Sequence, residues 1–294
     1  MRVFLTGATG FIGSRVASEL ISAGHQVLGL TRSDTGAQAI RALGGEALFG
    51  DIEDLPGLQR GAAGCDAVIH TAFDHDFTHF AENCQKDYRA IIALGSAMEG
   101  SDRPLIITAG AAAGSTGPGQ ASVEDHFDSE HPNPRVASEL AGRELSQRGV
   151  NVRVMRLTQI HDTVKQGLVS YIIAHARRTG LSAYVGDGLN SWSAAHVTDT
   201  ARLYRLVLEK GAAGARYHAS AEVDVSFKSI AQTVAQRLGV PLVALAAEKA
   251  SEHFGWLATF VDKDLKATSV KTRAELGWAP TGPGLLEDLQ RADI

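Results

Sequence analysis

Residues 6–13, with the sequence TGATGFIG, decide the fold of this 294-residue chain. They follow a short apolar run at residues 2–6 and open a segment, residues 11–24, whose apolar residues share one helical face and whose last residue, Gly24, is a predicted C-cap. Residues 25–31, HQVLGLT, form a second apolar run. A strand, a glycine-rich turn, a helix and a second strand in this order predict a βαβ unit.

The glycines of this stretch favour a dinucleotide site. Glycine permits a tight turn and lets backbone N–H groups approach a pyrophosphate, and the helix N-terminus adds positive potential there. Gly13 also lets the helix pack closely on the strand. Glycine-rich turns occur without ligands as well, but the surrounding βαβ pattern favours the nucleotide. The predicted contacts are Thr6, Gly7, Thr9, Gly10, Phe11, Ile12 and Gly13.

The end of the second strand predicts which nucleotide is bound. An NAD site usually places Asp or Glu there, where the carboxylate binds the ribose 2′-hydroxyl. This chain has Thr31, Arg32 and Ser33 instead. A guanidinium beside hydroxyl groups suits a 2′-phosphate, so the sequence predicts NADP(H) in preference to NAD(H). The alternative is that Arg32 is an ordinary solvated arginine.

Short apolar runs and helical segments alternate along the first half of the chain. The predicted strands are residues 46–51, 66–72, 103–110 and 151–158, and the predicted helices are residues 78–99 and 135–149. This alternation predicts an α/β fold with a parallel sheet covered on both faces. The later segments are helices at 170–180, 199–210 and 226–238, and a loop with one short strand at 183–199. We expect this second half to fold over the open edge of the first.

Composition excludes several classes of protein. The formal net charge of −5 argues against nucleic acid as a partner, because phosphate binding needs a basic face. No stretch approaches the roughly 18 apolar residues of a membrane-spanning helix, and the start of the chain does not read as a signal peptide. Cys65 and Cys84 are too few for a disulfide framework. We therefore expect buried thiols in a reducing, cytoplasmic setting.

Six segments together resemble the extended short-chain dehydrogenase/reductase superfamily. They are TGATGFIG, GDIEDL at 50–55, VIHTAF at 68–73, RPLIITAG at 103–110, HVTDTARLY at 196–204 and ELGWAPT at 275–281. The resemblance implies a Rossmann-type doubly wound sheet with a small C-terminal substrate-binding lobe. The nucleotide domain would comprise residues 1–158 with about 190–225, and the lobe about 159–189 and 226–294.

The resemblance also implies site residues and an assembly. Asp51 and Ile52 would lie near the adenine, and Thr71, Ala72 and Phe73 would line the nicotinamide side. A homodimer would form through the two predicted helices at 78–99 and 135–149. The family usually carries Tyr-x-x-x-Lys at the start of the second of these helices, with Tyr as acid/base and Lys lowering its pKa. A Ser or Thr at the end of the fifth strand orients the carbonyl, and Thr108 is the available hydroxyl.

This chain departs from the family at the Tyr-x-x-x-Lys motif, and two alignments stay open. In the first, RVASELAGREL is laid on the usual pattern, so that Arg135 takes the Tyr position and Glu139 the Lys position, which implies lost or different chemistry. In the second, HPNPR at 131–135 resembles an atypical branch in which His-x-x-x-Arg replaces the motif. His131 is then the acid/base and Arg135 takes the role of the lysine.

The prolines determine the local geometry of HPNPR. Asn133 is a predicted N-cap with Pro134 at the first helical position, so His131 lies in the preceding loop and does not share a helical face with Arg135. An imidazolium can donate a proton near neutral pH, and a guanidinium can stabilise an oxyanion or hold the cofactor ribose. The alternative is a surface His131 and an Arg135 that binds cofactor or forms an ordinary ion pair.

Further substrate contacts are predicted at the carboxyl edge of the sheet. Asp74 and His75 follow the fourth strand, at the edge where ligands bind in such folds. By resemblance, His161, Trp192 and His196 also approach the substrate, although Trp192 has a core position as its alternative. His75 and His79 have helical spacing for a metal but no convincing third ligand, so no metal is expected. The remaining candidate proton donors are Tyr88, Tyr171 and Tyr184.

The predicted function is the NADP-dependent reduction of a ketone or aldehyde on a small or medium, mostly apolar molecule. His131, Arg135 and Thr108 are the predicted catalytic residues. One alternative is a sugar-nucleotide epimerase or dehydratase, which needs a strong base and charges for a second diphosphate. The other is a non-catalytic redox sensor that binds NADP, which the first alignment favours.

Overall fold

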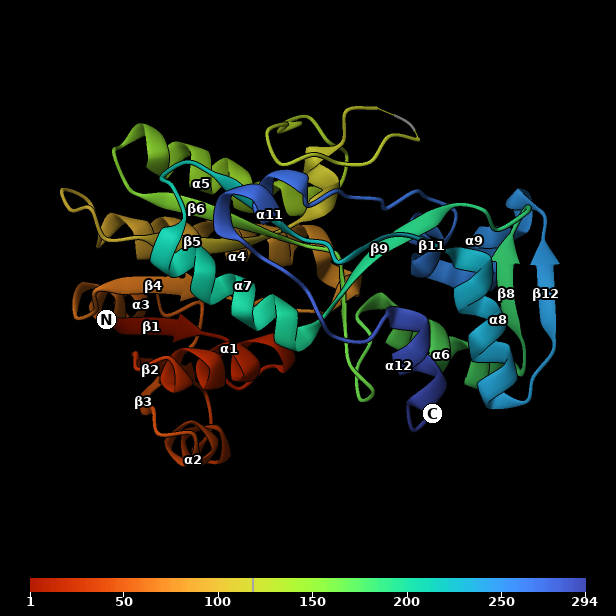
Figure 1. Ribbon diagram of the computed structural model, residues 1–294, viewed down its shortest axis with the longest axis horizontal. Coiled ribbons are helices and arrows are strands. Elements are labelled where there is room, and N and C mark those ends of the chain that lie inside the picture. Colours follow the sequence, from red (N-terminus) through yellow and green to blue (C-terminus); the bar gives the residue numbers. More distant parts are fainter. Residues whose placement is uncertain (118) are drawn as a thin grey trace.

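A seven-stranded parallel sheet forms the centre of the protein in the computed structural model, which describes residues 1–117 and 119–294 (Figure 1). The strand order is β10-β6-β5-β4-β1-β2-β3. These strands are β1 (Arg2–Thr6), β2 (Gln26–Thr31), β3 (Glu46–Phe49), β4 (Ala67–His70), β5 (Leu105–Gly110), β6 (Val152–Leu157) and β10 (Arg216–Ala219). The order reverses beside β1, so the doubly wound Rossmann-type prediction is confirmed.

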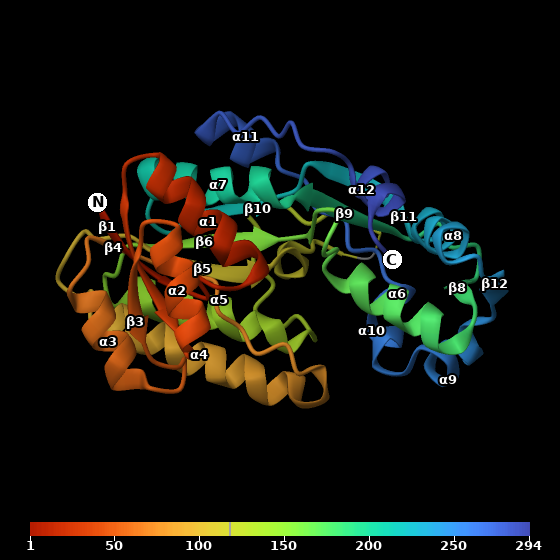
Figure 2. The same cartoon turned by 90° about the horizontal axis from the view of Figure 1, so that it is seen from below.

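Helices cover both faces of this sheet, as Figure 2 shows. One face carries α1 (Phe11–Ser22), α2 (Asp34–Ala42) and α7 (Val197–Lys210), and the other carries α3 (Leu55–Ala63), α4 (Phe80–Ser96) and α5 (Ala137–Gln147). The side chains of β1 alternate between the two cores: Val3 and Leu5 join the first, and Phe4 joins the second. Burial on both faces is why the central strands are continuous apolar runs.

The second half of the chain builds a lobe beyond the carboxyl ends of the parallel strands (Figure 1). Its strands are β7 (Gln159–His161), β8 (Ser182–Val185), β9 (Ser191–His196), β11 (Glu222–Ser226) and β12 (Leu242–Leu245). Its helices are α6 (Leu168–Thr179), α8 (Phe227–Leu238), α9 (Ala250–Phe254), α10 (Ala258–Val261) and α12 (Leu285–Arg291). A third apolar core holds the lobe together, and β7, β9 and β11 form the three-stranded sheet that joins it to the nucleotide half.

Two parts of the second half differ from the prediction. Residues 183–199 were expected to contain one short strand, but β8 and β9 both lie within or across this range. Residues 226–294 were expected in the lobe, but α11 (Val270–Leu276) returns to the nucleotide half. Leu276 and Trp278 join the first core beside α7, because the Trp278 indole N–H donates to the Asp199 carbonyl oxygen at 3.0 Å.

Both cysteines are buried free thiols, as predicted. Burial raises the pKa of Cys84 to about 11. No helix among residues 1–117 and 119–294 is long and apolar enough to cross a membrane. None of the large hydrophobic side chains exposed in this part of the chain lies on α4 or α5. The homodimer implied by the family resemblance therefore stays a prediction.

Candidate active site

A cavity of about 660 Å³ is lined by residues of both halves. The nucleotide half contributes the glycine-rich turn, the ends of β2 and β5 and the segment after β4, and the lobe contributes α6 and Phe260. Most of the predicted site residues line it. They are Gly7, Thr9, Gly10, Phe11, Ile12, Gly13, Thr31, Arg32, Asp51, Ile52, Thr71, Ala72, Phe73, Asp74, His75, Thr108, His131 and Arg135.

The glycine-rich turn has the form that a pyrophosphate requires. Gly7 has φ of 70°, and a Cβ there would lie 2.7 Å from the Ala72 nitrogen. A Cβ on Gly13 would lie only 2.0 Å from the Gly7 oxygen, so the predicted close packing of α1 is confirmed. No side chain caps α1 after Gly10, and its first turn carries no acid. The first N–H groups of α1 thus remain for an anion at the cavity wall.

Two predicted nucleotide contacts do not line the cavity. Thr6 is fully buried, and its hydroxyl lies 2.7 Å from Nδ1 of His70. The Ser33 hydroxyl caps α2 by accepting the Gly36 N–H at 3.1 Å. Thr31 and Arg32 do reach the cavity, with the Arg32 side chain 82% exposed and 3.6 Å from the Asp51 carboxylate.

The HPNPR segment folds as its prolines predict. A short 3₁₀ turn, η3 (Pro134–Val136), starts at Pro134, and the Asn133 side chain caps it by accepting the Arg135 N–H at 2.9 Å. His131 lies in the loop before it and lines the cavity. Its Nδ1 accepts the Asn133 N–H at 3.1 Å, which orients the ring.

Arg135 lies in a buried ion pair at the cavity wall. Its guanidinium donates to Asp87 at 2.6 Å and to the Thr108 carbonyl oxygen at 3.0 Å, and it stacks 4.2 Å from the centre of the Phe73 ring. Burial alone would raise the pKa of Asp87. The Arg135 charge and hydrogen bonds from His70 and Ser138 outweigh burial and lower that pKa. The cationic charge of Arg135 is therefore largely neutralised by Asp87.

Thr108, of the predicted catalytic set, and Glu139, of the first alignment, both have their side chains engaged in hydrogen bonds within the protein. The Thr108 hydroxyl lies 2.7 Å from both the His70 carbonyl oxygen and the Tyr204 hydroxyl, so its single proton is already shared within the core. This differs from the prediction that Thr108 orients a carbonyl. Glu139, at the Lys position of the first alignment, is buried and accepts from Arg156 at 2.6 Å and Arg216 at 2.9 Å.

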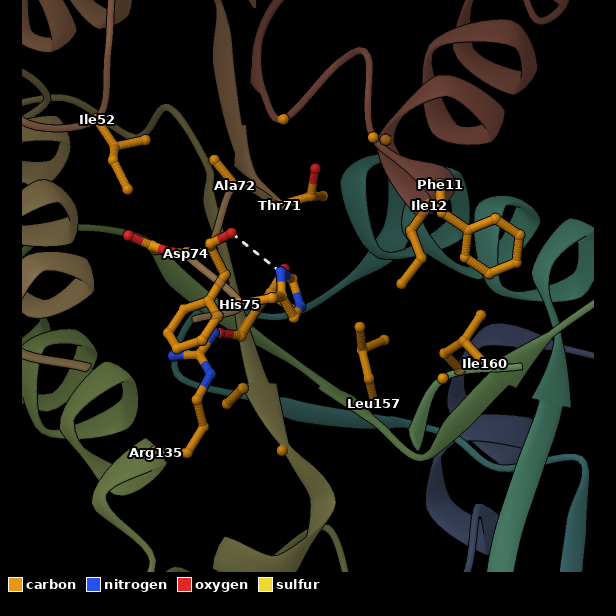
Figure 3. A pocket seen from close by; sticks show the side chains of 18 of the residues that line it. Phe11, Ile12, Ile52, Thr71, Ala72, Asp74, His75, Arg135, Leu157 and Ile160 are labelled. Carbon is orange, nitrogen blue, oxygen red and sulfur yellow. Dashed lines mark hydrogen bonds between the residues drawn. The ribbon is translucent and has the colours of Figure 1, made fainter. Parts of the chain in front are cut away.

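His75 extends into the cavity from the segment after β4. Its Nδ1 lies 3.1 Å from the Phe73 carbonyl oxygen, the contact drawn as a dashed line in Figure 3. The ring lies between the side of the cavity that carries Arg135 and the side that carries Ile12 and Leu157 (Figure 3). Although water reaches this side chain, burial within the cavity lowers the pKa of His75, and the charges of Lys165 and Arg135 lower it further.

Three predicted substrate contacts lie outside the cavity. His161 is fully buried and pairs through Nδ1 with Asp288 at 2.7 Å, while His196 caps α7 and lies 3.7 Å from the same carboxylate. Trp192 is fully buried in the lobe core, with its ring centre 5.0 Å from that of Phe227. Trp192 therefore has the core position that was the alternative to a substrate contact. These residues join the two halves of the protein.

Sequence reasoning missed the aromatic wall of the cavity. Phe77 and Phe80 contribute to it from the segment after β4, and Tyr171 and Phe260 from the lobe. The Phe77 ring stacks on Trp256 at 4.5 Å, and both contact Tyr171 edge to face. The spacing of Phe73, Phe77 and Phe80 was a signal for one side, but nothing in the sequence paired it with Tyr171, Trp256 and Phe260 far along the chain. Of the remaining tyrosines, Tyr88 hydrogen bonds to Glu144, and Tyr184 does not line the cavity.

The glycine-rich turn and the parallel sheet lie within the region matched by a family model described as "NAD dependent epimerase/dehydratase family", residues 3–220. The chain belongs to this family. The match confirms the predicted resemblance to extended short-chain dehydrogenases/reductases, and the family is named for its dependence on NAD. In this chain no tyrosine stands at either alignment of the Tyr-x-x-x-Lys motif.

Relatives and solved structures agree with this membership. An uncharacterized protein of Schizosaccharomyces pombe is 42% identical over 98% of both chains. A 4-hydroxy-2-methyl-3-oxo-4-farnesyl-3,4-dihydroquinoline-1-oxide ketoreductase of Stigmatella aurantiaca is 24% identical over 95% of this chain and 92% of its own. The structure of a UDP-glucose 4-epimerase of Thermotoga maritima with UDP-glucose has a TM-score of 0.77 at 20% identity, covering 99% of this chain and 97% of that one. This last likeness concerns the fold.

Proposed function

We propose that the protein is an NADP-dependent reductase of ketones or aldehydes on small or medium, mostly apolar molecules. The observation that carries the proposal is the cavity itself. It is lined by the uncapped start of α1, by His131, His75 and Arg135, and by a wall of aromatic side chains. The similarity to a ketoreductase adds support for a carbonyl substrate.

The nicotinamide, His131 and water have separate roles at the substrate carbonyl. Reduced nicotinamide, when bound, supplies the hydride that goes to the carbonyl carbon. His131 donates its Nε2–H to the carbonyl oxygen and stabilises the negative charge that develops there. Because Nδ1 accepts the Asn133 N–H, Nε2 is the ring nitrogen left to polarise the carbonyl as a hydrogen-bond donor. The proton that completes the alcohol then comes from water.

Arg135 is a structural cation in this scheme. Because Asp87 neutralises it and Thr108 fixes it, Arg135 holds the Phe73 ring at the cavity wall. It shapes the nicotinamide side of the pocket and transfers no proton, since a guanidinium does not give up its proton near neutral pH.

The charges of the cavity argue against a sugar-nucleotide substrate. Such a substrate brings a second diphosphate, which needs free cations. Arg32, Lys86 and Arg135 each have a carboxylate within 4.0 Å. Within the part of the chain that the structure describes, Lys165 is the one cavity-lining Lys or Arg without such a carboxylate. The apolar and aromatic lining favours a reductase substrate instead.

Consumption of NADPH against a panel of ketones and aldehydes tests the proposal. We expect turnover by the wild-type protein and a fall in kcat of about 10²-fold in His131→Ala, because one donor at the developing oxyanion is removed. NADPH binding, followed by nucleotide fluorescence, should not change. His126→Ala is the matched control, since His126 is exposed and does not line the cavity. Unchanged turnover in His131→Ala would remove His131 from the mechanism, and tight NADPH binding without turnover would favour a sensor.

The preference for NADP is tested at Arg32. We expect Arg32→Ala to raise the Kd of NADPH about 10-fold and to leave the Kd of NADH almost unchanged, because a charge-assisted bond to the 2′-phosphate is lost. Isothermal titration with both nucleotides measures this. An equal effect on both would show that Arg32 does not distinguish them.

A further inference from the structure

We propose that the substrate of this enzyme carries a hydroxyl group near its reacting carbonyl, and that Nε2 of His75 accepts the hydrogen bond from this hydroxyl. The inference rests on the proposed function, because it places the carbonyl oxygen at His131. The substrate class is thus a hydroxy ketone or hydroxy aldehyde with an otherwise apolar body.

The first step is the tautomer of His75. Its Nδ1 lies 3.1 Å from the Phe73 carbonyl oxygen, and a carbonyl oxygen can only accept. Nδ1 therefore carries the ring proton, and in the neutral ring Nε2 is a bare acceptor. No described residue donates a hydrogen bond to this Nε2, whereas the side chain lines the cavity.

The second step is that the ring is held in place and neutral. Phe73 contacts it edge to face at 5.2 Å, and Phe77 does so at 6.2 Å. Burial lowers the pKa of His75, and the positive charges of Lys165 and Arg135 lower it further. Nε2 of His75 therefore offers an acceptor at neutral pH. An acceptor suits a hydroxyl donor and not an anion.

The third step is that His131 has the opposite tautomer. Its Nδ1 accepts the Asn133 N–H at 3.1 Å, so in the neutral ring the proton is on Nε2. The cavity thus combines one imidazole donor and one imidazole acceptor, each fixed by a backbone group. Arg135 connects the segments that hold the two imidazoles. It stands two residues after Asn133 in the sequence, and its guanidinium stacks on the Phe73 ring.

A donor and an acceptor in one cavity select for a molecule with both groups. A carbonyl oxygen can satisfy only His131, because it has no proton to give. A simple ketone gives Nε2 of His75 no hydrogen bond and displaces the water that reaches it, and sites use such lost hydrogen bonds to reject an analogue that lacks a hydroxyl.

The experiment compares three ketones that share one phenyl ketone body: 2-hydroxyacetophenone, 2-methoxyacetophenone and acetophenone. In the wild-type protein we expect kcat/KM for the hydroxy ketone to exceed the other two by about 10- to 100-fold. In His75→Phe, which keeps a ring but removes the acceptor, this ratio should fall toward one. His79→Phe is the control, because His79 is exposed and outside the cavity, and there the ratio should stay as in the wild type.

Nitrogen NMR of the histidine rings tests the basis of the inference without any turnover. We expect the proton on Nδ1 in His75 and on Nε2 in His131, with the His75→Phe and His131→Ala spectra giving the assignments. A proton on Nε2 of His75 at neutral pH would overturn the inference.

The outcomes separate this inference from the proposed function. Equal kcat/KM for the three ketones would overturn the hydroxyl preference and leave a carbonyl reductase in place. A preference that survives in His75→Phe would also overturn it, because the hydroxyl would then be bound elsewhere. NADPH binding with no consumption for any carbonyl compound would overturn the proposed function, and the inference would fall with it.

Discussion

At the scale of single residues, the site depends on one buried carboxylate. Asp87 accepts hydrogen bonds from Arg135, Ser138 and His70 at 2.6, 2.5 and 3.0 Å. His70 in turn contacts the Thr6 hydroxyl at the start of the glycine-rich turn. The carboxylate therefore connects the nucleotide turn, α4 and the HPNPR segment, and removing the Arg135 guanidinium leaves its charge without compensation.

Removing the guanidinium tests this dependence. We expect Arg135→Ala to lower the free energy of unfolding at pH 7 by about 3 kcal/mol, because a buried ionised carboxylate loses its counter-charge. Urea denaturation measures the change. Arg89→Ala, on the exposed side of α4, should stay within about 0.5 kcal/mol of the wild type. A similar small change in Arg135→Ala would mean that Asp87 is not ionised.

The same carboxylate predicts an acid dependence. The pKa of Asp87 is lower in the folded protein than its ordinary value of 3.8, so the stabilisation that it provides is complete above that ordinary value. It is lost as the pH falls through the lower folded pKa. Urea denaturation at pH 6 and at lower pH should therefore show a smaller acid loss in Asp87→Asn than in the wild type. An identical acid loss in both would assign it to other carboxyl groups.

At the scale of elements, the start of α1 is where close backbone packing requires a glycine. A Cβ at Gly13 would lie 2.0 Å from the Gly7 oxygen, which is backbone and cannot move aside as a flexible side chain would. Gly64, at the end of α3, has only ordinary contacts near 3.7 Å for a Cβ.

The two glycines form a matched pair for an experiment. We expect Gly13→Ala to lower the free energy of unfolding by about 1–3 kcal/mol and to weaken NADPH binding, because α1 must shift away from the turn. Gly64→Ala should have little effect on either quantity. Thermal unfolding with and without NADPH measures both, and normal binding in Gly13→Ala would mean that the turn adapts.

The same elements show what could be predicted from the sequence and what could not. The boundaries of β1 and the cap at Gly24 followed from apolar runs and glycines, and the Asn133 cap followed from two prolines. The helices α2 and α3 were not predicted, because each has only nine residues with a glycine in its first turn. Strands β8, β10 and β12 have four residues each and, unlike β4, mix buried with partly exposed positions, so they gave no continuous apolar run and form by pairing with distant partners.

At the scale of the whole molecule, the cavity has its shape because the two halves meet across it. The predicted residues of the nucleotide half, except Thr6 and Ser33, reached the cavity because the carboxyl ends of parallel strands share one edge. The predicted residues of the second half, His161, Trp192 and His196, did not, because their burial depends on packing between the halves that no local pattern encodes.

The stack of Phe77 on Trp256 is one of the direct contacts between the segment after β4 and the lobe, and it makes a prediction at this scale. We expect Trp256→Ala to speed amide hydrogen exchange in residues 73–80 and to leave exchange in β1 and β4 unchanged, since an aromatic pair contributes about 1 kcal/mol. Phe49→Ala, at the exposed sheet edge, is the control. Unchanged exchange in residues 73–80 would show that the segment is held by the nucleotide half alone.

The position of Asp288 matters for how the chain folds during its synthesis. This residue lies on α12, the last helix described, yet it pairs with His161 of β7 and lies near His196 of β9. The ribosome therefore releases all seven parallel strands of the central sheet before the carboxylate that pairs with His161 has been translated. Until that moment Nδ1 of His161 lacks its partner, so the contact of α12 with β7 and β9 is among the last parts of the lobe to form.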